Sequence, residues 1–209
     1  MTRTWGDAAY PVRYVYDGYD RMIEMHTYRS GTGWGGETFP TATDEDVTRW
    51  EYHEATGLLL YKEDASLKRT AYTYAEGGRL RTRTWARTDE SSQPIVTTYA
   101  YNTATGELTT IDYSDTTPDI TFSYDRLGRQ RTITDAAGTR TFAYNETLQP
   151  VSETITGSLV NGTITRTYAQ EGVTGRDTGF TLGTGTGTDY AVSYGYDSTG
   201  RFSSLGWNI

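Results

Sequence analysis

The chain has 209 residues and is dominated by three residue types, with 40 Thr, 23 Gly and 18 Tyr. Thr and Tyr favour half-buried strand surfaces and Gly favours turns, so this composition predicts an all-β protein and disfavours a helical bundle. The net charge of −8 disfavours a nucleic-acid partner, the lack of a long apolar run excludes a membrane-spanning helix, and the absence of Cys excludes disulfides and Cys nucleophiles.

Pairs of aromatic residues separated by one residue recur along the chain. Because side chains alternate along a strand, both rings of a pair are expected on the same face. The second aromatic positions run from 16 to 196 with a mean spacing of about 26 residues, which indicates an internal repeat. A weaker copy is predicted to end at Tyr168, with Arg166 in the first aromatic position. The pairs are Tyr14 and Tyr16, Trp50 and Tyr52, Tyr72 and Tyr74, Tyr99 and Tyr101, Phe122 and Tyr124, Phe142 and Tyr144, and Tyr194 and Tyr196.

A turn is predicted directly after each pair. Asp or Asn at the next position can accept hydrogen bonds from the backbone of the turn, and a Gly supplies the positive φ that closes it. An alternating stretch such as 80–85 then forms the returning strand, so each copy is a predicted β-hairpin. Asp20 and Leu148 stand where Gly is expected in the first and sixth copies. The turn residues of the repeat are Asp17, Gly57, Gly78, Arg79, Gly106, Asp125, Gly128, Arg129, Asp197, Gly200 and Arg201.

A single hairpin is only marginally stable in water, so about eight hairpins are expected to stack beside one another. The predicted fold is therefore an all-β, extended, curved or spiralling antiparallel sheet with aromatic rows on one face. It forms one repeat array over residues 1–209, and the wide first interval predicts an insertion near 29–48.

Two Gly-rich stretches lie outside the hairpin motif. Gly31–Glu37 belongs to the predicted insertion, and Gly183–Asp189 is expected to connect two strands. Neither is followed by Lys and Ser or Thr, so neither is a phosphate-binding loop. Because long loops often carry function on a rigid scaffold, Trp34 is the residue at which a ligand contact is expected.

Segments such as Tyr124–Gln130 (YDRLGRQ) and Tyr196–Phe202 (YDSTGRF) resemble the YD repeats of the Rhs family. That family includes bacterial Rhs polymorphic toxins, the C components of tripartite insecticidal toxins and the teneurins. The resemblance implies a β-sheet strip that spirals into a hollow shell around a toxic C-terminal polypeptide. It also implies a non-enzymatic structural role without cofactors, in a bacterial protein that is secreted or displayed at the cell surface. The expected partners are the enclosed polypeptide and neighbouring repeats of the same shell.

Complete members of that family carry a DPxG motif near the end of the shell, followed by a variable toxin domain. Neither is found in this sequence, and the first residues (MTRTWGDAAYPV) contain no secretory signal. The chain is therefore expected to be a segment of wall from a longer protein.

Candidate catalytic and metal-binding residues are few. Two acidic groups could suggest a glycan hydrolase, but neither spacing fixes a distance between carboxylates, and solvated loops are the simpler expectation. His26 and His53 lie in different repeats, which argues against a shared metal site. We therefore assign no catalytic, cofactor-binding or metal-binding residue. The acidic groups are Asp44, Glu45 and Asp46, and Asp112, Asp115 and Asp119.

The alternative function is an extracellular carbohydrate-binding or adhesion module, because exposed aromatic rings can stack on sugars. The paired rings are expected to serve as the packing of the sheet itself, since every copy has them. Trp residues outside the pairs are better candidates for glycan contact. These are Trp5, Trp34, Trp85 and Trp207.

Overall fold

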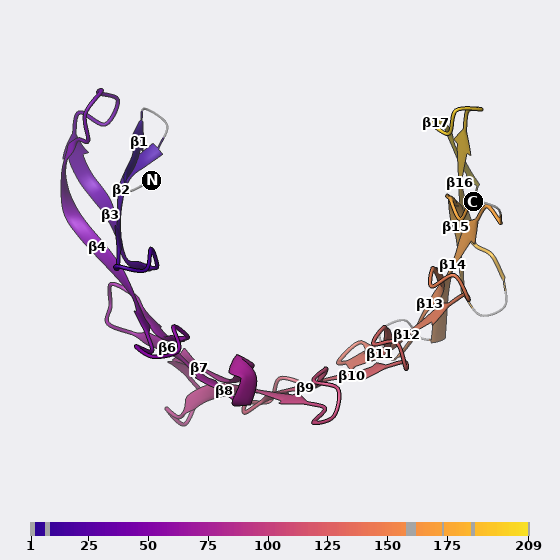
Figure 1. The fold of residues 1–209 in the computed structure, drawn as a ribbon, viewed down its shortest axis with the longest axis horizontal. Coiled ribbons are helices and arrows are strands. Elements are labelled where there is room, and N and C mark those ends of the chain that lie inside the picture. The colour runs from indigo at the N-terminus through magenta and orange to yellow at the C-terminus, as the bar shows by residue number, and fades with distance from the viewer. Residues whose placement is uncertain (1–2, 7–8, 158–161, 173, 185–186, 209) are drawn as a thin grey trace. The chain divides into compact units, whose positions relative to one another are not determined.

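The computed structural model describes residues 3–6, 9–157, 162–172, 174–184 and 187–208, and these residues form an almost purely β structure (Figure 1). The strands are β1 (Arg3–Gly6), β2 (Ala9–Tyr16), β3 (Met22–Thr32), β4 (Thr41–Tyr52), β5 (Leu59–Glu63), β6 (Arg69–Tyr74), β7 (Leu80–Thr88), β8 (Pro94–Tyr101), β9 (Leu108–Tyr113), β10 (Ile120–Tyr124), β11 (Gln130–Asp135), β12 (Gly138–Tyr144), β13 (Pro150–Gly157), β14 (Gly162–Gln170), β15 (Asp177–Thr184), β16 (Tyr190–Tyr196) and β17 (Phe202–Asn208). The helical content of the described residues is one short 3-10 turn, Glu76–Gly78. The prediction of an all-β array of tandem hairpins is confirmed.

The chain divides into two units, residues 1–98 with 113–115, and residues 99–112 with 116–209. Within the first unit, β1 to β8 pair in chain order, each antiparallel to the next. Within the second unit, β9 to β17 pair in the same way. Each unit is therefore a meander of hairpins, as the repeat predicts.

A β-bulge recurs at the second position of the aromatic pair. In the hairpin of β10 and β11, Ser123 lies opposite Thr132 but Tyr124 lies opposite Gln130, so the returning strand carries one extra residue. A bulge bends the strand locally and redirects the side chain beside it. The second ring of the pair can therefore lean toward the neighbouring hairpin. Equivalent register shifts occur at Tyr16, Tyr52, Tyr74, Tyr144 and Tyr196.

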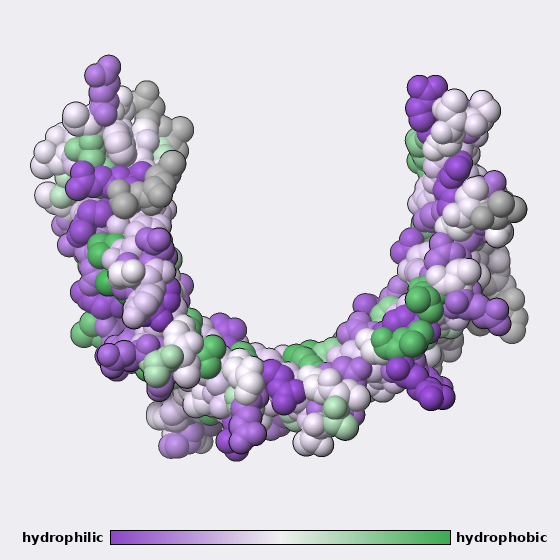
Figure 2. Space-filling view, in the orientation of Figure 1, coloured by the Kyte–Doolittle hydropathy of each residue, from purple (hydrophilic) through white to green (hydrophobic). Residues whose placement is uncertain are grey.

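The sheet of each unit has little apolar core. Among the described residues, the buried apolar side chains are Pro11, Tyr28, Pro40 and Ile95. Figure 2 shows hydrophilic and intermediate residues over most of the visible face, with hydrophobic residues in small separate patches. The stability of each unit must therefore come mainly from contacts between neighbouring hairpins.

The predicted insertion falls on the longest strands of the first unit. Residues 29–48 include the ends of β3 and β4, which are 11 and 12 residues long, and the connection between them. Part of this connection lies against β1, because the indole Nε1 of Trp5 donates a hydrogen bond to the carbonyl of Gly36 (2.9 Å). The rings of Trp5 and Phe39 meet edge to face with centroids 5.6 Å apart. Longer strands therefore account for much of the wide first interval.

The connection predicted at Gly183–Asp189 begins at the end of β15. The backbone N–H and the hydroxyl of Thr184 each donate a hydrogen bond to Asp189 Oδ2 (2.6 Å). Residues 185–186 of this stretch lie outside the described residues.

The turns have a residue with positive φ at their fourth or fifth position. In the turn 125–129, Gly128 has φ +77°, and its N–H donates to the carbonyl of Asp125 (3.1 Å). A Cβ added at Gly128 would also lie 3.3 Å from Oε1 of Glu107. In the turn 145–149, Leu148 occupies the same position with φ +70°, and its side chain is exposed.

These two turns provide a matched pair of variants. Gly128→Ala should lower the free energy of unfolding by about 1–2 kcal/mol, because a Cβ is strained in the left-handed region. Leu148→Gly should raise the free energy of unfolding by about 0.5–1 kcal/mol, because it relieves the same strain and loses only exposed surface. Urea unfolding followed by circular dichroism measures both changes. Equal changes in the free energy of unfolding in the two variants would contradict the requirement for positive φ at this turn position.

Candidate functional site

The repeated feature with the most defined chemistry is the turn after the aromatic pair. In the turn 125–129, Oδ1 of Asp125 accepts hydrogen bonds from the backbone N–H groups of Leu127 (2.8 Å) and Arg129 (3.0 Å). Oδ2 of Asp125 accepts a hydrogen bond from Arg129 Nε (2.6 Å). One carboxylate thus holds both the backbone of the turn and the side chain that closes it. The same arrangement is found for Asp17 with Arg21 and for Asp197 with Arg201.

These hydrogen bonds favour the ionised carboxylates. The side chain of Arg129 is the main cause that lowers the pKa of Asp125. The hydroxyl of Thr199 and the backbone N–H of Arg201 lower the pKa of Asp197 to about 2. At Asp17, burial opposes ionisation, but the hydrogen bonds from Arg21 and Tyr19 outweigh burial and lower the pKa.

The arginine that closes a turn also contacts the next hairpin. The guanidinium of Arg129 lies 4.3 Å from the ring centroid of Tyr144, and the hydroxyl of Tyr144 donates to the carbonyl of Gln130 (3.0 Å). A cation over an aromatic face is attracted by the ring quadrupole. Each such tyrosine is therefore held at its face and at its hydroxyl by the preceding hairpin. Tyr52 is held in the same way, by the guanidinium of Arg21 and the carbonyl of Met22. Tyr196 is held by the guanidinium of Arg176 and the carbonyl of Asp177.

The closing side chain also lies over the glycine of the next turn. A Cβ added at Gly57 would lie 3.2 Å from Arg21, and a Cβ at Gly200 would lie 3.1 Å from Arg176. The corresponding pairs without arginine are Gly78 with Leu58, Gly128 with Glu107 and Gly175 with Gln149. Glycine is thus favoured twice, by its positive φ and by the neighbouring side chain. We call this series of closing residue, next tyrosine and next glycine the turn ladder.

The structure corrects the predicted register of the weak seventh copy. Gln170, not Tyr168, occupies the second position of the pair, because it lies at the bulge opposite Asp177. Its Nε2 donates to the carbonyl of Pro150 (2.8 Å), in the place of a tyrosine hydroxyl. Tyr168 is therefore the first aromatic residue, and Arg166 lies beside it with its guanidinium 4.7 Å from the Tyr168 ring centroid. An amide can replace the phenol here because the acceptor requires only a donor at the right distance.

The twenty repeat residues singled out from the sequence all fall within the hairpin unit. The aromatic residues are in the strands that precede the turns: Tyr14, Tyr16, Tyr52, Tyr74, Tyr99, Tyr101, Tyr124, Tyr144 and Tyr196. The remaining residues lie in the turns that follow: Asp17, Gly57, Gly78, Arg79, Gly106, Asp125, Gly128, Arg129, Asp197, Gly200 and Arg201.

Trp34 lies against the ring of Tyr10, with centroids 5.0 Å apart. Its Nε1 is buried without a hydrogen-bond partner among the described residues. The other predicted glycan contacts differ from one another. Trp85 stacks with Arg83 (3.6 Å) and donates to Thr97 (2.9 Å), whereas Trp207 is 68% exposed.

The acidic group at 44–46 does not form one site. Ser30 donates to Asp44 (2.5 Å), whereas Asp46 pairs with Arg29 (2.9 Å). Glu45 points to the other face of β4 and joins a separate polar cluster, described next. The second acidic group is also dispersed, with Asp112 in β9 and the other two carboxylates in the connection to β10.

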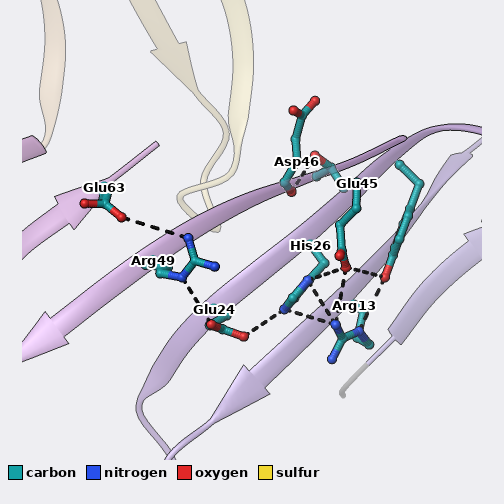
Figure 3. Close-up of polar contacts among 9 residues, drawn as sticks. Arg13, Glu24, His26, Glu45, Asp46, Arg49 and Glu63 are labelled. Carbon is teal, nitrogen blue, oxygen red and sulfur yellow. Dashed lines mark hydrogen bonds and ion pairs between the residues drawn. The ribbon is translucent and has the colours of Figure 1, made fainter. Parts of the chain in front are cut away.

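A polar cluster surrounds the buried His26 in the first unit (Figure 3). Its Nδ1 contacts Glu45 and its Nε2 contacts Glu24 (2.9 Å), while Arg13 lies across the ring. Burial opposes ionisation of Glu45, but hydrogen bonds from His26, Tyr28 and Arg13 outweigh it and lower the pKa of Glu45. The cluster is an internal ion network, because its charged groups are engaged by one another.

The network continues as a row of alternating charges across four strands. Glu24, Arg49, Glu63 and Arg69 lie directly opposite one another on β3 to β6. The ion-pair distances along the row are 3.3, 3.9 and 2.6 Å. No group of three His, Cys, Asp or Glu residues in the described part of the chain is arranged to hold a metal ion.

The corresponding face of the second unit carries hydroxyl groups. One row places Thr110, Thr121, Thr134, Thr139, Thr156 and Thr163 directly opposite one another on β9 to β14. A parallel row holds Ser123, Thr132, Thr141, Thr154 and Thr165. Neighbouring hydroxyls bond to one another, for example Ser123 with Thr132 (2.6 Å).

The fold and the turn ladder define a class of protein, a single-layer β-hairpin repeat. Comparison with known proteins finds no matching family model and no matching curated protein. Solved structures do match, at the level of fold. A chain in the crystal structure of TcdB2–TccC3 without its hypervariable C-terminal region has a TM-score of 0.54 and 17% sequence identity, and the match covers 98% of this chain. A chain in the TcdB2–TccC3–Cdc42 structure has a TM-score of 0.53 and 17% identity over 95% of this chain.

This chain spans only about an eighth of the matched proteins, 13% and 12% of their respective lengths. No helix among the residues that the structure describes is long and apolar enough to cross a membrane.

The lowered pKa values of the turn carboxylates predict acid sensitivity. A carboxylate whose pKa is lowered in the folded state stabilises the fold above its unfolded pKa, and this contribution is lost as the pH falls toward the folded value. The stability that Asp197 contributes should therefore be complete above about pH 5 and lost between about pH 4 and pH 2.

Asp125→Asn tests this expectation. Asn keeps an oxygen for the backbone, as Asn145 does for the N–H of Gln149 (2.9 Å), but it has no charge for the arginine. The variant should unfold at a lower urea concentration than the wild type at pH 7, and the difference should shrink as the pH falls below the ordinary carboxyl pKa of about 4. A difference that stays constant with pH would show that the ionised carboxylate does not stabilise the turn.

Proposed function

We propose that this chain is a segment of wall from a YD-repeat shell of the Rhs type, which encloses a C-terminal toxin or other cargo polypeptide. In this role the chain is not an enzyme and needs no cofactor. Enclosure is steric, so it depends on a continuous sheet rather than on one reactive residue. The whole protein would be a bacterial protein that is secreted or displayed at the cell surface.

The turn ladder is the observation that carries this proposal. The turns that end in Arg21, Arg129 and Arg176 each present the same two groups to the next tyrosine, a guanidinium for the ring face and a carbonyl for the hydroxyl. Such contacts can be repeated without limit, which is what a long wall requires. The fold similarity to TcdB2–TccC3 structures also supports it, since the matched chains are far longer than this one.

The native gene product tests the proposal. An antibody against this chain should capture from the source cells a polypeptide much larger than 23.3 kDa. Mild proteolysis should spare a segment outside this sequence, and the same segment should be degraded once the shell is opened in denaturant. Capture of a 23.3 kDa species alone, or equal degradation of the segment in both conditions, would contradict cargo enclosure.

A glycan-binding module is the second candidate, and the exposure of Trp207 favours it. If it is correct, cellohexaose or chitohexaose should produce a saturable change in Trp fluorescence, because a sugar ring would stack on the indole. Trp207→Ala should abolish the change, and Trp34→Phe should leave it intact, since Trp34 is engaged with Tyr10. A flat titration with both sugars in the wild type would contradict glycan binding at this residue.

A further inference from the structure

Leu58, Glu107 and Gln149 take the place of the closing arginine at three steps of the turn ladder among the described residues. The turn His53–Leu58 closes with Leu58, and the next tyrosine is Tyr74, whose hydroxyl donates to the carbonyl of Leu59 (2.9 Å). This hydrogen bond is the one that Tyr52, Tyr144 and Tyr196 make. The geometry of the ladder is therefore kept at Tyr74, while the group that would cover its ring is shorter.

A cleft lies where the arginine side chain would be. Its volume is about 460 Å³, and it is mostly apolar. Leu58 reaches only to the rim of the next turn, where its Cδ atoms would lie 3.8 and 3.9 Å from a Cβ at Gly78. We call this the Leu58 cleft, and its principal lining residues are His53, Leu58, Leu60, Tyr72, Tyr74 and Gly78.

The other steps of the ladder indicate which group fits over such a ring. At Tyr52, Tyr144 and Tyr196, a guanidinium lies 4.8, 4.3 and 4.7 Å, respectively, from the ring centroid. Burial raises the pKa of the Tyr74 hydroxyl, so its ring remains a neutral phenol with an electron-rich face. A planar cation is therefore the group expected over the Tyr74 ring, because arginine side chains of this chain cover the equivalent tyrosines.

The charge around the cleft favours a cation as well. Glu54 and Glu76 are exposed in the two turns that border it, and the chain as a whole carries a net charge of −8. His53 occupies the position of the turn carboxylate and accepts a hydrogen bond from the N–H of Thr56 (3.2 Å). An incoming guanidinium would find an open ring face and a negative rim.

We propose that the Leu58 cleft binds an arginine side chain presented by another polypeptide, which stacks on Tyr74 as the chain's own arginines stack on its other tyrosines. This inference concerns a site within the first unit and goes beyond the proposed function. It does not require that the chain encloses cargo.

An NMR titration with short peptides tests the site. The peptide acetyl-Gly-Arg-Gly-amide should cause saturable shifts in the ring resonances of Tyr72 and Tyr74. The citrulline peptide keeps the planar group without its charge, and the lysine peptide keeps the charge without the plane. Both should bind roughly fivefold or more weakly, because each lacks one half of the stacking interaction.

Variants that fill the cleft provide the decisive comparison. Leu58→Arg should abolish the saturable shifts, because its own guanidinium would cover Tyr74. The double variant His53→Glu/Leu58→Arg reproduces the ends of the turn Glu171–Arg176, which has the same length and the same backbone hydrogen bonds, so it should keep the fold while it also fails to bind. Gln149→Arg makes the same kind of change in the other unit and should bind as the wild type does.

Three outcomes would overturn the proposal. The first is equal binding of the arginine, citrulline and lysine peptides. The second is wild-type binding by a folded double variant. The third is an equal loss of binding in Gln149→Arg, which would place the arginine contact elsewhere.

Discussion

The contact between one turn and the next is the interaction on which this structure depends. A single layer of β-sheet has no opposing layer to bury its side chains, and the described residues contain almost no apolar core. Each hairpin must therefore be covered by its neighbours in the sequence. The turn ladder provides this cover, because the residue that closes one turn lies over the ring and the glycine of the next. The distances are short and the contacts repeat, so many weak interactions add up along the array.

The two units use the opposite face of the sheet in different ways. The first unit places alternating charges and the buried His26 there, and the second places rows of threonine hydroxyls. In both cases the polar groups satisfy one another across the strands. Because the polar side chains of this face bond to one another, the face needs no further layer to cover it. This is consistent with its exposure to water or to a polar partner.

The repeat motif itself could be predicted well, because its physics is local. Strand alternation, the Asp turn and the positive φ of Gly each depend on a few neighbouring residues, so the all-β hairpin array was predicted correctly. The register of the seventh copy was predicted wrongly because its second pair position carries an amide instead of an aromatic ring. The structure needs a hydrogen-bond donor at that position, and Gln170 supplies one. The same hydrogen bond is therefore made there by an amide instead of a phenol.

What the sequence by itself determined is the hairpin unit, its turns and the face on which its rings lie, since these follow from the two-residue alternation and from backbone sterics. What only the tertiary structure decided is which side chains meet between hairpins. Arg21 lies over the ring of Tyr52, 31 residues further along the chain. Glu45 contacts His26, whereas the neighbouring Asp44 and Asp46 do not. Such contacts depend on the register and bulges of paired strands, which no local pattern encodes. The open face of Tyr74 is likewise decided by the tertiary structure, because it becomes visible only when each turn is compared with the next in space.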